Sequence, residues 1–589
     1  MSLWSTFASP AAFQLLAASE WWVTRWLTPF WIFGVGIAVG LIAAAALWLV
    51  IFLLSLIPGI GKLRQHGIAF WIGAAGGAAF AGAVGAVVKD AFVSPATGEF
   101  IRDEWLLLLS SLWALGALTL WTLLYCANSR FIQELWQTIT TGIGGQIALA
   151  LVCIVAACTA MTLVVEESFS LLRALPTLAD AGETTETVIV PGVRENQVEG
   201  VFEPLDLDYN PLALARVIIR SDRNVTLAVN DPEDTSAFIE PIQVLANQPI
   251  QWNRMSNAKA PVPVSLGADL RVQNEEYEAA TITFQLLTAA QRPEMKTAAE
   301  VGLLVFVLSS LWFLQLGAAP RVAAIAMSTA KSELSQPLPK ILMIFVALCI
   351  GLFVFVPFHT LGEDIKLLKE SGVTLIMVAT LFQGVWSASN SVSDEIEGRT
   401  ALTLLSKPIR RSSFIFGKYI GIVWLLVLMI IVLGTAELLA VAYKPLYDAR
   451  ENSLDTPLWQ LNHLEMRSTL PGILMVMLQV TVLTGLAVAL ATRLTQLANF
   501  AVCFAVYLVG HLTPAIVSSS QDTFPIVEFV GQLIAVLTPN LDLFSMHGAI
   551  DSNTVIPSVY LSALLVYSML YCGLVVLLGL LLFEDRDLA

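Results

Sequence analysis

Residues 393–418 read SDEIEGRTALTLLSKPIRRSSFIFGK, and a long apolar segment stands on each side of them. The stretch holds three acidic and five basic residues. Its acids, Asp394, Glu395 and Glu397, follow the first apolar segment directly. An apolar run of about 20 residues is the length that crosses a bilayer core. The stretch therefore predicts a charged loop at a membrane surface, between two spanning helices.

The composition of the whole chain supports this prediction. The chain has 589 residues, of which 57% are hydrophobic and 13% are charged, and its mean hydropathy is +0.75. Soluble domains carry about 25% charged residues. The net charge of −15 argues against a nucleic-acid partner. We expect a mainly α-helical fold, a polytopic transmembrane bundle.

Apolar runs of spanning length predict about eleven membrane spans. They lie near residues 30–57, 67–88, 105–126, 142–165, 299–320, 341–358, 373–390, 416–441, 468–491, 497–517 and 557–583. Basic residues favour the cytoplasmic side of a membrane. Placing the basic loops there predicts a multi-pass protein of the inner (cytoplasmic) membrane, with a cytoplasmic C-terminus and residues 167–298 outside the cytoplasm.

Residues 167–298 differ from the rest of the chain because they are polar and acidic. They hold about nineteen carboxylates against about ten basic residues. Short alternating runs recur between turn-forming residues: Ile282, Phe284 and Leu286 share one face of a strand, as do Val225, Leu227 and Val229. We expect an inserted β-sandwich-like domain of six to eight strands.

The charged stretch itself predicts a short helix along the membrane surface. Gly398 lets the chain turn, Thr400 can cap a helix, and Pro408 ends it. Arg410, Arg411 and Lys418 suit lipid phosphates at the cytoplasmic face. An ordinary positive loop with a surface helix would explain the basic residues. It does not explain the acids, which anionic lipid repels and which favour a protein partner.

This pattern of residues resembles the type-2 ABC exporter permease family. It is similar to the branch of permeases for multi-copper enzyme maturation, such as the nitrous-oxide-reductase maturation permease. The matching residues are Glu395, Glu397, Gly398, Thr400, Leu404, Leu405, Pro408, Arg411, Phe414, Gly417 and Lys418. Asp394 and Arg399 lie in the same candidate docking region.

The hydropathy pattern and the resemblance together predict a division of the chain into four parts. Residues 1–166 would form an N-terminal membrane region of about four spans, and residues 167–298 the extracytoplasmic β-rich domain. Residues 299–340 would form a connecting span and a cytoplasmic loop. Residues 341–589 would form the permease module of six spans, with a coupling helix near 400–407. The additional N-terminal spans and the β segment depart from the compact members of the family.

The resemblance also implies partners. The coupling helix would dock into a separate cytoplasmic ABC ATPase subunit, with Glu395 and Glu397 contacting basic residues there. ATP and Mg would be bound by that subunit, because neither PGIGKLRQ nor FGKYIG in this chain fits a Walker loop. We therefore expect no enzyme activity, cofactor or metal on this chain. A second permease half, in a homodimer or heterodimer, membrane lipid, and an envelope or secreted partner at the β domain complete the expected partners.

Three residues are candidates for a transport pathway or gate. Glu437 lies toward the outer end of its span, where it can line a path or reach lipid headgroups. His511 falls within an apolar segment and can face a cavity. Glu528 lies between Pro525 and Pro539, in runs too short to span, which favour re-entrant helices or a solvated loop.

Two other functions compete with an ATP-driven exporter. An ion-coupled secondary transporter would need acids within the membrane or a broken pair of helices. The sequence shows few acids away from the ends of its spans. A non-transporting membrane anchor would instead act on an envelope partner through the β domain and transmit force to it.

Overall fold

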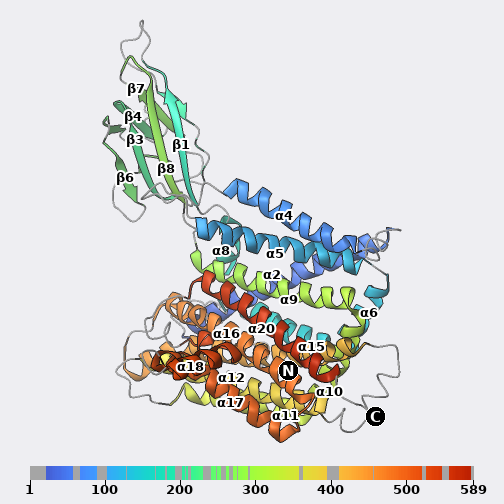
Figure 1. Cartoon of the computed structure of the whole chain (residues 1–589). Coiled ribbons are helices and arrows are strands. Elements are labelled where there is room, and N and C mark those ends of the chain that lie inside the picture. The colour runs from blue at the N-terminus through green and yellow to red at the C-terminus, as the bar shows by residue number, and fades with distance from the viewer. Residues whose placement is uncertain are drawn as a thin grey trace, which may run out of the picture. The chain divides into compact units, whose positions relative to one another are not determined.

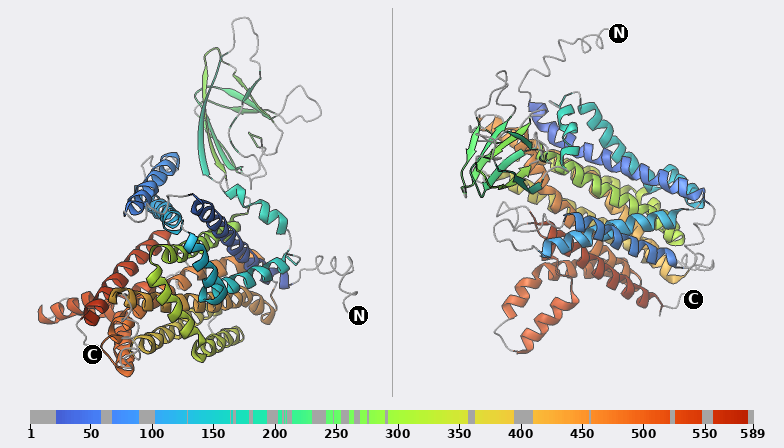
Figure 2. Two further views of the ribbon diagram at one scale, coloured as in Figure 1. Left: turned by 90° about the vertical axis from the view of Figure 1, so that its right-hand side faces the viewer. Right: turned by 90° about the horizontal axis from the view of Figure 1, so that it is seen from above.

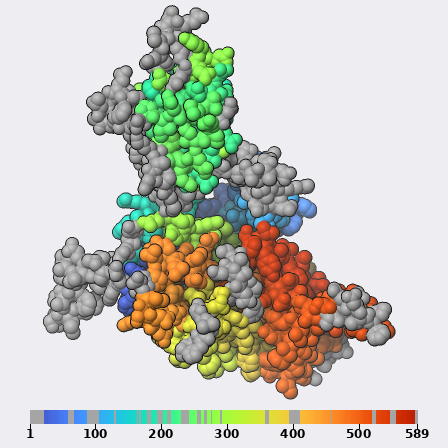
Figure 3. Space-filling view, turned by 90° about the vertical axis from the view of Figure 1, so that its left-hand side faces the viewer, coloured from blue at the N-terminus to red at the C-terminus, as the bar shows by residue number. Residues whose placement is uncertain are grey.

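The chain divides into two compact units. The helical unit comprises residues 1–87, 101–166 and 300–589, and the β unit comprises residues 88–100 and 167–299. The computed structural model describes residues 22–57, 67–88, 102–127, 129–162, 164–165, 168–178, 182–192, 202–205, 207, 209, 214–229, 241–246, 248–253, 260–263, 269–274, 276–288, 292–356, 363–393, 410–454, 457–520, 525–546 and 556–584. The other residues are grey in Figure 3.

Most of the long helices of the helical unit lie roughly along one common axis (Figures 1 and 2). Its first helices are α2 (Trp22–Ser55), α4 (Ile68–Val88), α5 (Arg102–Cys126), α6 (Ser129–Thr141), α7 (Ile143–Met161) and α9 (Lys296–Ala318). The later ones are α10 (Pro320–Ser335), α11 (Pro337–Phe353), α12 (Asp364–Ala388), the π-helical turn η4 (Ser389–Ser393), α15 (Arg411–Glu451), α16 (Trp459–Ala491), α17 (Gln496–Ser520), α18 (Pro525–Leu537), the 3₁₀ turn η5 (Asp542–Phe544) and α20 (Ser558–Glu584).

Nine described helices are long and apolar enough to cross a membrane. These nine are α2, α4, α5, α7, α9, α15, α16, α17 and α20. The number rises to ten if α10 and α11, bent by 64° where they meet, count as one span. The prediction of a mainly helical chain with many apolar spans is confirmed. The span expected at 373–390 falls in α12, which is not among the nine and begins with several charged residues.

Exposed apolar side chains show where lipid would contact the helical unit. On α11 the exposed fractions of five such side chains lie between 55% and 69%, and the five share one face of the helix: Ile341, Ile344, Phe345, Leu348 and Leu352. Apolar patches of this kind are rare on soluble monomers. They are the expected surface of a helix that faces hydrocarbon.

The segment after α9 differs from the expected loop. Residues 320–335 form the helix α10, which lies against α15. Ala323, Ala326 and Ala330 are buried on one side of it. Small residues let two helices approach closely, and this spacing is the signal that the loop interpretation missed.

The β unit consists of two four-stranded antiparallel sheets. Their strands are β1 (Gly182–Val190), β2 (Glu203–Leu205), β3 (Leu214–Ser221), β4 (Val225–Val229), β5 (Ile242–Val244), β6 (Ile250–Asn253), β7 (Leu270–Asn274) and β8 (Ala280–Thr288). The strand orders are β1-β8-β3-β6 and β2-β7-β4-β5. Three short helical segments, α8 (Ser168–Arg173), η2 (Pro176–Leu178) and η3 (Pro293–Met295), complete the described part.

One hydrophobic core joins the two sheets, because side chains from both belong to a single cluster. Ile282, Phe284 and Leu286 on β8 are all fully buried, so the predicted face is confirmed. On β4, Val225 and Leu227 are buried but Val229 is only partly so. The expected number of strands agrees with the eight described.

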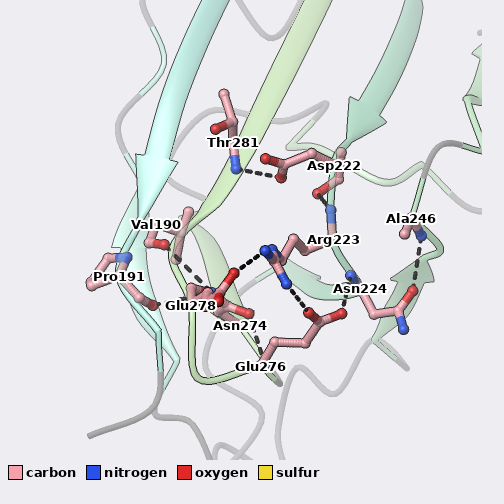
Figure 4. A network of polar contacts seen from close by, with 11 residues as sticks. Val190, Pro191, Asp222, Arg223, Asn224, Ala246, Asn274, Glu276, Glu278 and Thr281 are labelled. Atoms are coloured by element: carbon pink, nitrogen blue, oxygen red, sulfur yellow. Dashed lines mark hydrogen bonds and ion pairs between the residues drawn. The ribbon is translucent and has the colours of Figure 1, made fainter.

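Polar contacts tie together two turns of the β unit (Figure 4). Arg223, between β3 and β4, forms ion pairs with Glu276, at 2.8 Å, and with Glu278, both between β7 and β8. The side-chain amide of Asn274 donates to the carbonyl of Glu278 at 2.9 Å, and its oxygen accepts from the backbone N–H of Glu276 at 2.9 Å. These contacts hold the β7–β8 turn in one conformation.

This polar cluster predicts an acid-sensitive β unit. The pKa of Glu276 lies below its ordinary value of 4.5, first because Arg223 donates a hydrogen bond to it. A carboxyl with a lowered folded-state pKa stabilises the fold above its ordinary pKa, and this contribution is lost as pH falls through the lowered value. We expect the Glu276→Gln variant to lose β structure less steeply than the unchanged protein as the pH falls below about 4.5. Circular dichroism of residues 167–298 measures this loss. An identical acid dependence in both proteins would contradict this.

Candidate functional site

The candidate docking loop lies mostly outside the described residues. This applies to Asp394, Glu395, Glu397, Gly398, Arg399, Thr400, Leu404, Leu405 and Pro408, and to the expected coupling helix at 400–407. The structure does describe the two ends that the loop joins, which are η4 and the start of α15. We call the side chains that hold these two ends the loop-anchoring site.

At the second end of the loop, Arg411 binds the C-terminus of α20. Its Nη1 donates to the carbonyl of Glu584 at 2.6 Å and to that of Phe583 at 3.4 Å. Arg493 donates from Nε to the carbonyl of Leu582 at 2.7 Å. The last carbonyls of a helix have no partner within it and carry partial negative charge. Two cations therefore satisfy this end of α20 and fix it beside the loop.

Aromatic packing reinforces the same end. Phe414 is buried and stacks on Phe583 with ring centroids 5.7 Å apart. The Nζ of Lys418 lies 5.6 Å from the centre of the Phe414 ring. The Lys418 side chain is buried, so the interpretation that it contacts lipid phosphates is wrong. Its position follows from the helical spacing, which puts residues four apart on one face.

Gly417 and Gly421 place α15 directly against α10. A Cβ at position 417 would lie 2.6 Å from Cβ of Ile325, and one at position 421 would lie 2.5 Å from the backbone oxygen of Ala326. Real Cβ atoms do not come this close to backbone. Gly417, matched in the sequence as part of the docking motif, is therefore a packing residue in this structure.

A buried polar cluster holds the first end of the loop. Glu333 on α10 accepts a hydrogen bond from the Ser387 hydroxyl at 2.7 Å, and Ser387 accepts one from the Gln383 amide at 2.9 Å. The other carboxylate oxygen of Glu333 accepts from Gln336 at 3.2 Å. Most buried polar groups in folded proteins are hydrogen-bonded. The end of α12 is thus tied to α10.

The π-helical turn η4 is tied to α17 in the same way. The Asn499 amide donates to the Ser389 hydroxyl at 3.0 Å and to the carbonyl of Ala487 at 3.1 Å. The Gln496 amide donates to Asn390 Oδ1 at 3.2 Å. π-helical turns are rare and occur frequently at functional sites. The chain enters the loop from a fixed and unusual backbone segment.

The loop-anchoring site therefore connects one short loop to five helices. α10, α12 and α17 hold its first end, and α10, α15 and α20 hold its second. A force applied to the loop would reach all five, because packed helices move as rigid elements. The sequence pattern identified Arg411, Phe414, Gly417 and Lys418 but missed Glu333, Ser387 and Asn499. The signal for Glu333 was a lone acid on the small-residue face of α10.

The close contact between α10 and α15 makes a testable prediction. We expect Gly421→Leu to lower the free energy of unfolding by about 1–3 kcal/mol, the usual cost of overpacking. Gly573→Leu on α20 is the matched control, because a Cβ there meets no atom within 4 Å. Thermal unfolding of the purified protein in detergent measures both. Equal midpoints for the two variants would contradict the packing assigned to α10.

The three candidate pathway residues lie apart from the loop. The Glu437 side chain has no exposed surface, so the alternative that it reaches lipid headgroups is wrong. His511 on α17 is half-buried, with its Nε2 3.0 Å from Nε2 of Gln479 and its ring 4.7 Å from that of Tyr507. Glu528 lies in α18, whose 13 residues are too few to span a bilayer. Its side chain is outside the described residues.

In comparisons with known proteins, no family model and no curated protein match this chain.

Proposed function

We propose that this chain is the transmembrane permease subunit of an ATP-binding-cassette exporter. The observation that carries this proposal is the charged loop between η4 and α15. Its acids, glycine and proline suit docking to a cytoplasmic subunit, and both its ends are anchored to the bundle. ATP and Mg would be bound by the separate ATPase subunit, and a second permease half would complete the transporter.

The anchoring contacts support a mechanism for transmission. Binding of ATP would move the ATPase subunit, and the docked loop would move with it. Because α10, α12, α15, α17 and α20 are fixed to the loop ends, they would tilt together and shift the permease between two states. A loop held by flexible segments would absorb this movement instead.

The arrangement of basic residues supports the proposed orientation. Arg411 and Arg493 meet at the C-terminal end of α20, and Arg321 opens α10, the helix that packs against the first turns of α15. Basic residues gathered at one end of a bundle favour the cytoplasmic side. In the proposed topology of about eleven spans, the loop and the C-terminus face the cytoplasm and the β unit lies outside it.

Affinity purification tests the proposal. The tagged chain, extracted gently from its native membrane, is expected to bring with it a subunit that contains a Walker loop. Its ATP hydrolysis should rise when the two are reconstituted together. Mass spectrometry identifies the subunit. If no such subunit accompanies the chain at any mild detergent concentration, the proposed function is wrong.

A second candidate function is ion-coupled secondary transport, which two observations favour. The α10–α11 pair is bent by 64°, and charged side chains are buried inside the helical unit at Lys369, Glu437 and Lys444. Broken helices and buried charges are typical of such transporters. Transport by the chain alone, driven by an ion gradient without ATP, would favour this function over the first.

A further inference from the structure

A buried carboxyl group without a hydrogen-bond partner lies where three helices meet. Glu437 on α15 is 0% exposed, and neither of its carboxylate oxygens has a hydrogen-bond partner among the described residues. A Cβ at Gly372 on α12 would collide with this carboxylate. The absence of a side chain at Gly372 therefore makes room for the Glu437 carboxyl, which packs directly against α12.

A cation on the same face of α12 is paired with another carboxylate. Lys369 lies one turn before Gly372 on α12, on the same face of that helix. Its ammonium group is ion-paired with Glu465 on α16 and lies 2.7 Å from the Ser468 hydroxyl. Only 7% of the Lys369 side chain is exposed, against 21% for Glu465. Lys369 is therefore paired with Glu465 and lies on the same face of α12 as Gly372, against which the Glu437 carboxylate packs.

Several other charged groups on the elements packed around Glu437 have partners of their own. They are Asp364 and Lys366 on α12, Lys444 and Asp448 on α15, Arg467 on α16 and Arg25 on α2. His463 on α16 is buried, and its Nε2 has no hydrogen-bond partner among the described residues. Lys444 lies 2.8 Å from Asp448, and Arg467 lies 3.1 Å from Glu300. Arg25 donates to the carbonyl of Pro457 at 3.4 Å. Lys369 is thus the cation placed to exchange with Glu437.

An isolated carboxylate in a low-dielectric interior costs many kcal/mol, so it must bind a proton or a cation. We propose that Glu437 is a proton-binding site that Lys369 empties. While Lys369 is paired with Glu465, Glu437 holds a proton and is neutral. When Lys369 moves to Glu437, that proton leaves to water and Lys369 stays cationic. Glu465, which is partly exposed, is then solvated.

This exchange links proton release to a movement of helices. Lys369 is on α12, Glu437 on α15 and Glu465 on α16, so a shift of α12 relative to its two neighbours would favour one pairing of Lys369 over the other. These same helices pack on one another along the helical unit. One proton would be bound and released in each cycle of the shift. Glu437 would hold this proton whether an ATPase or an ion gradient drives the movement.

Infrared spectroscopy of the purified full-length chain in lipid tests the proposal without any ATPase subunit. A protonated carboxyl gives a C=O stretching band that an ionised carboxylate lacks. At neutral pH we expect the wild-type spectrum to contain this C=O band. We expect Glu437→Gln to reduce the band by the area of one carboxyl group. Glu451→Gln, which changes an exposed acid on the same helix, is the matched control and should leave the band unchanged.

Glu465→Gln tests the exchange itself. It removes the charged partner of Lys369, and Lys369 should then pair with Glu437. Glu437 should lose its proton as a result, so the band should be lost although Glu437 is present. Circular dichroism checks that each variant keeps its helical content. An unchanged band in Glu437→Gln would show that Glu437 is ionised and would overturn the proton site. A band that persists in Glu465→Gln would overturn the exchange.

Discussion

Replacing Glu395 and Glu397 together by alanine is expected to reduce the amount of co-purifying ATPase subunit by at least about tenfold. Truncating one partner of a close charge pair at an interface costs about 2–5 kcal/mol, and each 1.4 kcal/mol corresponds to about a tenfold change in affinity. The two acids are the part of the loop that orientation and lipid contact do not explain. Quantitative pull-down from detergent-solubilised membranes measures the change.

The matched control changes two acids at the opposite ends of the same helices. Glu363 precedes α12 and Glu451 ends α15, and both are exposed. Their replacement by alanine removes the same charge but lies far from the loop. We expect it to leave the ATPase subunit bound. If the Glu395 and Glu397 variant retains as much subunit as this control, the docking assignment is wrong.

Removing the Phe284 ring is expected to lower the free energy of unfolding of the β unit by about 3–5 kcal/mol. The ring is 0% exposed and belongs to the core that joins the two sheets. Domains of this size have a total stability of about 5–15 kcal/mol, so Phe284→Ala removes a large share. Residues 167–298, produced alone in soluble form, should give a β-type circular dichroism spectrum, and chemical denaturation then measures the loss.

Leu287→Ala on the same strand is the matched control. Leu287 points to the other face of β8 and is 37% exposed, so its truncation should cost much less, on the order of 1 kcal/mol or below. Similar losses for Phe284→Ala and Leu287→Ala would contradict the shared core. A mainly helical spectrum for the segment would contradict the β assignment as a whole.

The sequence alone determined that the chain is mainly helical with many apolar segments of spanning length. It also determined where most of the helices and strands lie. Apolar runs of spanning length predicted the long helices, and the alternation around Phe284 predicted a buried strand face. Both are local properties, because hydropathy over about 20 residues and a period of two need no knowledge of distant parts of the chain. The charged loop expected at 394–409 was predicted for the same reason.

Only the tertiary structure decided what the individual polar residues contact. Arg411 binds carbonyls at positions 583 and 584, and Lys369 pairs with Glu465, almost one hundred residues away. Whether Glu437 faces lipid, water or another helix depends on how α12, α15 and α16 pack. These partners are distant in sequence, and a helical pattern says which residues share a face but not which helix covers it. Burial and pairing of charges are therefore properties of the folded bundle.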